Sequence, residues 1–214
     1  MPIPRDAPPQ PRKQPKQQRS LVTVDSILEA AARILERDGF AGFNTNAIAA
    51  LAGVSPGSLY QYYPHKDAVL RDLVRRDVDA RTGRALAAIE AHSGRGALAA
   101  CVRAALEHAQ QRPALTTQLA LAEPLVLVEA HDSALVAPLI MALTQVVMRD
   151  YGATQPVAVN LVSDVLGICK GMLLTAAARD GIAVSDLVDR VVLAVVSYVD
   201  ASSVSAELAG DIRS

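Results

Sequence analysis

The polar residues between Asn44 and Lys66 are the ones whose types and spacing could do chemistry. The run Ser55-Pro56-Gly57-Ser58-Leu59-Tyr60-Gln61-Tyr62-Tyr63 combines small residues, hydroxyl groups and a single amide. Small residues let a partner approach the backbone closely, and tyrosine hydroxyls can reach phosphate groups. A glutamine side chain can bind adenine through two hydrogen bonds. The run therefore indicates contact with DNA.

Enzyme chemistry is not indicated. Gly53–Gly57 matches the hydrolase pattern G-x-S-x-G, but that pattern needs a strand before its serine, and here a helix is predicted. Gly94–Ala99 matches the dinucleotide pattern G-x-G-x-x-A, and it too follows a predicted helix. The four histidines and two cysteines have no metal-ligand spacing. We therefore predict a protein that is not an enzyme, with no catalytic residue, metal or cofactor.

Two short helices are predicted to position the polar run. Asn44 can cap a helix over 45–52, which Gly53 ends. Ser55 can cap a second helix, with Pro56 in its first position, that ends at about residue 63. Two helices joined by a short turn that contains glycine form a helix-turn-helix. The residues expected to face the core are Ile48, Leu51, Leu59 and Tyr63.

The rest of the sequence predicts helices only. A first helix begins after Thr23 and ends at Gly39, and a long helix begins at about Lys66. Apolar residues then recur with helical spacing over about 95–111, 114–129, 133–150, 156–180 and 185–202, the last capped by Ser185. The predicted fold class is all-α, with an N-terminal three-helix helix-turn-helix domain and a C-terminal helical domain.

Residues 24–70 resemble the DNA-binding domain of the TetR family of transcriptional regulators. The matching segments occur in order and without gaps: Ile27-Leu28, Ala30-Ala31, Gly39-Phe40, Thr45, Ile48-Ala49, Ala52-Gly53-Val54-Ser55, Gly57-Ser58-Leu59-Tyr60, Tyr62-Tyr63, Lys66-Asp67 and Val69-Leu70. The resemblance implies DNA contacts by Thr45, Ser55, Gly57, Ser58, Tyr60, Tyr62 and Lys66, and a role in sequence specificity for Asn46, Pro56 and Gln61.

The resemblance also implies a homodimeric repressor that a small effector releases from a palindromic operator in double-stranded DNA. A TetR-like activator and a helical interaction module without DNA binding stay open as alternatives. The expected domains are a disordered basic Pro-rich tail over 1–20, a DNA-binding domain over 21–66, a ligand-binding and dimerisation domain over 67–202, and a C-terminal tail over 203–214.

The distribution of charge predicts a role for the basic tail. No charged residue occurs between Phe40 and His65, so we expect basic residues of the tail to supply phosphate contacts. These are Arg12, Lys13, Lys16 and Arg19. Deletion of 1–20 should then weaken DNA binding and flatten its salt dependence. No secretory signal and no uninterrupted apolar run of about 18 residues are seen, so we expect a cytoplasmic protein without a membrane span.

The scarcity of aromatic residues constrains the effector. The chain has two Phe, five Tyr and no Trp, and five of these seven lie between Phe40 and Tyr63. Ring stacking is therefore scarce in the C-terminal part, and an aliphatic effector is favoured. The candidate ligand-binding residues are Leu98, Cys101, Val102, His108, Gln118, Glu123, Met141, Asp164 and Met172. The candidate dimer interface comprises Leu161, Val165, Ile168, Gly171, Met172, Leu187, Val191 and Val195, residues that could instead pack within the monomer.

Overall fold

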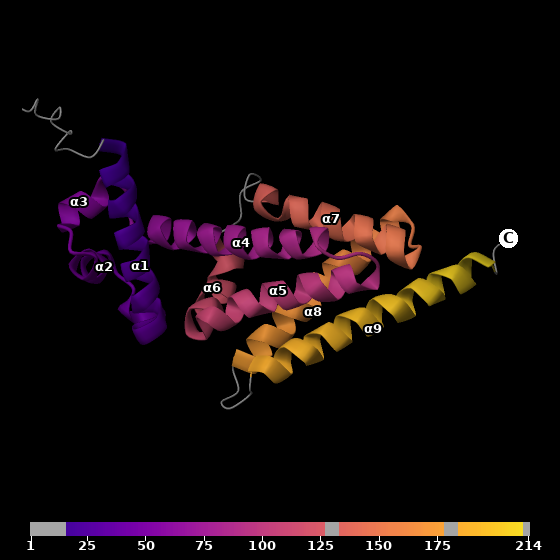
Figure 1. Cartoon of the computed structure of the whole chain (residues 1–214). Coiled ribbons are helices and arrows are strands. Elements are labelled where there is room, and N and C mark those ends of the chain that lie inside the picture. Colours follow the sequence, from indigo (N-terminus) through magenta and orange to yellow (C-terminus); the bar gives the residue numbers. More distant parts are fainter. Residues whose placement is uncertain (1–15, 127–132, 178–183, 212–214) are drawn as a thin grey trace, which may run out of the picture.

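The computed structural model describes residues 16–126, 133–177 and 184–211, and these form nine α-helices with no strand among them (Figure 1). The predicted all-α class is confirmed. The helices are α1 Lys16–Gly42, α2 Thr45–Ala52, α3 Pro56–Tyr60, α4 Lys66–Glu90, α5 Arg95–Gln111, α6 Pro113–Val126, α7 Ser133–Tyr151, α8 Gln155–Ala177 and α9 Val184–Asp211.

The N-terminal helices form a small head with its own apolar core. Ile27, Ile34, Ile48, Leu59 and Val69, from α1 to α4, are completely or almost completely buried in it. In Figure 1 the head lies at one end of the molecule, and α4 runs from it into the larger helical body. Because α4 packs in both parts, it links the head directly to the body.

The body is a bundle of α5, α7, α8 and α9, and the second half of α4 packs against α5 and α7. Its core includes Leu98, Leu143, Val147, Val191 and Val195. Two stretches, Ala134–Tyr151 and Gln155–Ala176, are also long and apolar enough to cross a membrane. This is a weak indication, since core helices of globular proteins share that length and composition.

Several helix boundaries differ from the sequence-based prediction. Lys16–Ser20 belong to α1 rather than to a disordered tail, because after Pro15 no proline opposes helix formation. The chain does turn at Gly39 as predicted, with φ 59°, but helical residues continue to Gly42. The last helix continues to Asp211, so the expected tail after residue 202 is largely helical. Residues 1–15 and the predicted helical positions 127–129 and 178–180 lie outside the described residues.

Candidate nucleic-acid interface and ligand cavity

Side-chain caps define the turn between α2 and α3. The Asn44 Oδ1 accepts a hydrogen bond from the Ala47 amide at 2.9 Å, at the start of α2. Gly53 ends α2 in the left-handed conformation, with φ 69° and ψ 28°. The Ser55 Oγ then accepts a hydrogen bond from the Ser58 amide at 3.0 Å. Two caps and one glycine therefore fix both helices locally, as the sequence predicts.

Buried residues hold α3 against the rest of the head. Leu59 has no exposed surface and Tyr63 is 7% exposed, so both face the core as predicted. The Tyr63 hydroxyl donates a 2.5 Å hydrogen bond to Asp72 on α4. Burial and this hydrogen bond raise the pKa of Tyr63. Leu51 differs from the prediction: it is 46% exposed, because α2 buries only its Ile48–Ala49 side.

The outer surface of α2 and α3 carries the predicted DNA-binding residues. Tyr60 is half exposed, and its hydroxyl lies 3.0 Å from the Thr45 Oγ1, which joins the two helices across the surface. None of the ten candidates is buried. Asn46, Ser55, Pro56, Gly57, Tyr60, Gln61 and Lys66 are exposed, and Thr45, Ser58 and Tyr62 are partly exposed.

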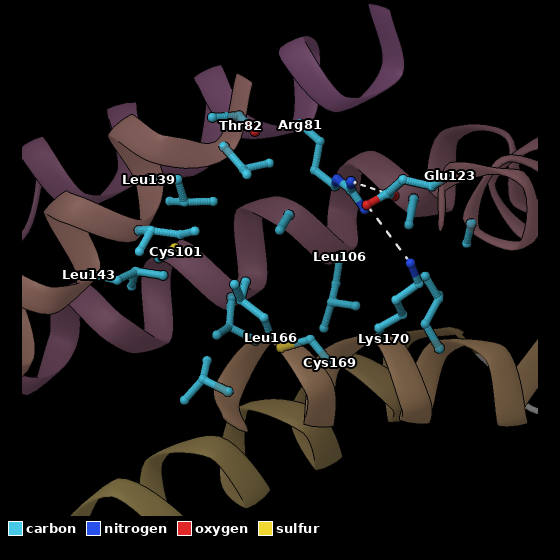
Figure 2. A pocket seen from close by; sticks show the side chains of 18 of the residues that line it. Arg81, Thr82, Cys101, Leu106, Glu123, Leu139, Leu143, Leu166, Cys169 and Lys170 are labelled. Atoms are coloured by element: carbon cyan, nitrogen blue, oxygen red, sulfur yellow. Dashed lines mark hydrogen bonds and ion pairs between the residues drawn. The ribbon is translucent and has the colours of Figure 1, made fainter. Parts of the chain in front are cut away.

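A cavity of about 230 Å³ lies in the body between α4, α5, α6, α7 and α8 (Figure 2). No aromatic residue occurs among the described residues that line it. Aliphatic side chains and threonines form most of its wall, which suits the burial of hydrocarbon. They are Thr82, Val102, Ala105, Leu106, Ala109, Thr116, Ala120, Val136, Leu139, Ile140, Leu143, Val165, Leu166 and Leu173.

One end of the cavity is charged. The Glu123 carboxylate on α6 lies 3.1 Å from the Arg81 guanidinium on α4 and 3.8 Å from the Lys170 Nζ on α8. Figure 2 shows the three side chains converging at this end. Their side chains are 25–39% exposed, so they are only partly solvated. Three helices that are separate in sequence therefore meet at one ion cluster.

Two thiols, those of Cys101 and Cys169, also line the cavity. Burial raises the pKa of Cys101 to about 12 and that of Cys169 to about 11. Both thiols are therefore protonated at neutral pH. In that state they are small apolar wall groups, because the thiolate is the nucleophile and the metal ligand.

Comparison with known proteins identifies the type of domain in the N-terminal head. Residues 27–73 match the model of the bacterial regulatory proteins of the tetR family. The N-terminal head belongs to the TetR family. The match includes α2, the turn, α3 and the first part of α4, so it covers the helix-turn-helix described above. No curated protein sequence is similar enough to this chain to count as a relative.

Solved structures of TetR-family regulators share the fold over most of the chain. The fatty acid degradation regulator FadR from Bacillus halodurans has a TM-score of 0.67 and 16% identity, over 86% of this chain and 97% of that one. A TetR family transcription regulator from Marinobacter aquaeolei VT8 has a TM-score of 0.60 and 19% identity, over 87% and 97%. The TetR-like regulator LfrR from Mycobacterium smegmatis, solved with proflavine, has a TM-score of 0.62 and 23% identity, over 84% and 97%.

In the body, three of the nine candidate ligand residues line the cavity: Cys101, Val102 and Glu123. The others lie elsewhere. Leu98 is buried in the core, Met172 packs against that core, and Met141 is 63% exposed. The His108 Nε2 lies 2.9 Å from Asp77, Asp164 accepts a hydrogen bond from Tyr198, and Gln118 lies close to Gly39.

Sequence reasoning missed the cations at the charged end. Lys170 could have been noticed in the sequence, because it is the only basic residue of the apolar helix α8. Arg81 could not have been noticed, because α4 is rich in charged residues and its sequence is typical of a solvent-exposed helix.

The candidate dimer residues require revision. Five of them are at most 4% exposed and pack in the core of the same chain: Leu161, Val165, Leu187, Val191 and Val195. Ile168 and Met172 are partly buried against that core, and Gly171 is exposed. Among the side chains of α8 and α9 that the structure describes, the large apolar ones left exposed are instead Val159, Leu166, Leu193 and Tyr198.

Proposed function

We propose that this TetR-family regulator is a homodimeric repressor, which a small aliphatic effector releases from a palindromic operator in double-stranded DNA. The observation that carries the proposal is the position of α6. One side of this helix, with Leu115, Leu119 and Ala122, packs into the core of the head. The adjacent side, with Thr116, Ala120 and Glu123, lines the cavity. A molecule in the cavity therefore contacts a helix that also packs against the core of the head.

In the proposed complex α3 enters the major groove. Gln61 and Asn46 are exposed amides that can read base edges, and Pro56 offers an apolar contact. Thr45, Ser55, Ser58, Tyr60 and Tyr62 present hydroxyl groups to phosphates, and Gly57 allows a close backbone approach. The exposed Lys66 adds a positive charge in the first turn of α4.

The homodimer is proposed to form through α8 and α9. Val159 and Leu193 are 46% and 67% exposed in the single chain. A Cβ added at Gly167 or Gly171 would meet nothing within 4 Å, so α8 is thin on that surface and open to another helix. Two copies related by a two-fold axis would present two reading heads to a palindromic site. We place this assembly in the cytoplasm, where its operator would be.

The aliphatic effector is inferred from this chain's own cavity. FadR is described as a fatty acid degradation regulator, whereas LfrR was solved with proflavine, a planar ligand. The shared fold therefore accommodates different ligand chemistry. Here the aliphatic wall favours a flexible hydrocarbon chain over a planar ring, because no aromatic residue lines the cavity in the described part of the chain.

DNA binding is tested by fluorescence anisotropy with DNA from upstream of the gene, at several salt concentrations. We expect specific binding, and Lys66→Gln should reduce the slope of log K against log salt by about one, since one phosphate contact is lost. Arg149→Gln is the matched control, because it removes one exposed charge from α7, in the body. No preference for the upstream DNA over unrelated DNA would contradict the proposal.

The basic tail is tested by deletion of residues 1–15, which leaves α1 intact. If Arg12 and Lys13 contact phosphates, binding should weaken and the salt slope should decrease by up to about two. An unchanged slope would show that the tail does not contribute. In a transcription assay with the same promoter, the full-length chain should lower transcript yield, whereas an increase would indicate an activator.

A further inference from the structure

The charged end of the cavity has an excess of positive charge. Arg81 and Lys170 bring two cations, and Glu123 brings one carboxylate. The Lys170–Glu123 separation of 3.8 Å is too long for a hydrogen bond, so the ammonium is only loosely engaged. A partly desolvated cation is stabilised by a closer anion. The cavity is therefore better matched to an anionic head group than to a cationic or neutral one.

The remaining wall sets the shape of the ligand. An apolar cavity of about 150 Å³ can hold benzene, which has six non-hydrogen atoms. In proportion, the cavity of about 230 Å³ holds roughly nine such atoms. Leu139, Leu143 and Leu166 line the part away from the ions, as Figure 2 shows. These dimensions suit an aliphatic chain of about seven or eight carbons.

We propose that the cavity binds a medium-chain aliphatic monocarboxylate, whose carboxylate replaces that of Glu123 between Arg81 and Lys170. The proposal rests on the effector-responsive function above and specifies its ligand. Glu123 occupies the anion position in the ligand-free protein, and the ligand carboxylate competes for it. Because Glu123 belongs to α6 and Arg81 to α4, ligand binding breaks the ion pair that joins these two helices at the cavity.

The ligand class is tested by calorimetric titration of the full chain, without DNA, with sodium octanoate, 1-octanol and octylamine at pH 7.5. These probes share one chain length and differ in charge. Octanoate should bind at least about tenfold more tightly than the other two, since a charge-assisted hydrogen bond contributes roughly this much. Equal or tighter binding of octylamine would overturn the proposal.

The position of the carboxylate is tested with variants. Arg81→Gln and Lys170→Gln should each weaken octanoate binding about tenfold or more and leave octanol binding nearly unchanged. Glu123→Gln should tighten octanoate binding several-fold, because it removes the competing carboxylate. Weaker octanoate binding to the Glu123→Gln variant would overturn the displacement of Glu123.

A further variant tests whether the ligand binds in the cavity at all. Leu139→Phe fills space in the wall without changing the ion cluster, so it should abolish binding of octanoate and octanol alike. Equal octanoate binding by this variant would place the ligand elsewhere and overturn the proposal. Circular dichroism establishes that each variant is folded. If the chain binds octanoate selectively but does not bind DNA, only the proposed function is rejected. If the chain binds DNA but does not bind octanoate, only the ligand class is rejected.

Discussion

Replacement of Arg112 by methionine should weaken the connection between the head and the body. Arg112 lies between α5 and α6, and its guanidinium binds two carboxylates of α1. Its Nε and Nη2 donate to the two carboxylate oxygens of Glu36 at 2.7 and 2.6 Å, and its Nη1 donates to Glu29 at 2.9 Å. Such a two-point arginine–carboxylate pair is among the stronger interactions between side chains.

The magnitude follows from the exposure of the groups. The side chains of Arg112 and Glu36 are 35% and 27% exposed, so their pair is screened less than a surface pair. Glu29 is 47% exposed and also accepts a hydrogen bond from Arg33, so its contribution is small. We expect Arg112→Met to lower the free energy of unfolding by about 1–2 kcal/mol. The melting temperature should then fall by roughly 2–8 °C.

Urea and thermal unfolding measure the effect, and Arg33→Met is the matched control. Arg33 is 64% exposed and, among the residues that the structure describes, forms an ion pair with Glu29 alone, on its own helix, so its loss should cost less than about 0.5 kcal/mol. A double-mutant cycle of Arg112→Met with Glu36→Gln isolates the two-point pair. Equal losses in the Arg112 and Arg33 variants, or a coupling energy near zero, would refute the reasoning.

The same variant has a pH signature. Burial alone would raise the pKa of Glu29, but hydrogen bonds from Arg33 and Arg112 outweigh it and the pKa is lowered. A carboxyl group whose pKa is lower in the folded state stabilises the fold above its unfolded pKa of about 4.3. That contribution disappears as the pH falls through the lower folded value. The difference between wild type and Arg112→Met should therefore shrink below about pH 4.

Two further predictions concern the proposed dimer surface and the turn of the head. Leu193→Asp, at a position 67% exposed on α9, should weaken the dimer at least about tenfold, since a two-fold interface contains each substitution twice. Light scattering should then detect monomers of this variant. Leu125→Asp, at an exposed position of α6, is the control and should leave the molar mass unchanged. A Leu193→Asp variant that stays dimeric would show that the interface lies elsewhere. Gly53→Ala should lower the free energy of unfolding by about 1–2 kcal/mol because of the positive φ, and Gly83→Ala, within α4, should raise it by roughly 0.5–1 kcal/mol. Urea unfolding separates these cases, and the same sign for both would contradict the backbone argument.

The head could be predicted well from the sequence because its determinants are local. Asn44 and Ser55 cap helices that begin with the next residue, and Gly53 ends the helix just before it. Each of these interactions spans only a few residues, so the pattern alone contains it. Leu51 was misplaced because a helix of eight residues has too few apolar positions to define its buried side.

The proposed dimer surface could not be predicted in the same way. In α9, Val191, Val192, Leu193, Val195 and Val196 occupy most of the circumference of the helix. Helical periodicity then shows that several sides are apolar, but it does not show which side meets the same chain. The tertiary structure decides this: Val191 and Val195 face the core, whereas Leu193 faces outward.

The cavity, the proposed ligand site, depends on contacts between distant residues. Arg81, Glu123 and Lys170 lie far apart in the sequence and come from three helices. Each alone resembles an ordinary surface charge. Only their convergence beside an aliphatic wall gives them a common role, and no periodicity of a single helix indicates that convergence.

Arg112 and Glu123 lie at opposite ends of α6, and this arrangement gives a route from a ligand in the cavity to the core of the head. Arg112 holds the start of α6 against α1, whereas Glu123 lies about 15 Å further along the helix, at the cavity. Loss of the Glu123–Arg81 pair would release the far part of α6 while its start stays attached to α1. Motion of α6 would then be passed to the head core through Leu115 and Leu119. In the proposed mechanism, the change in DNA affinity cannot exceed the difference in ligand affinity between the two arrangements of α6.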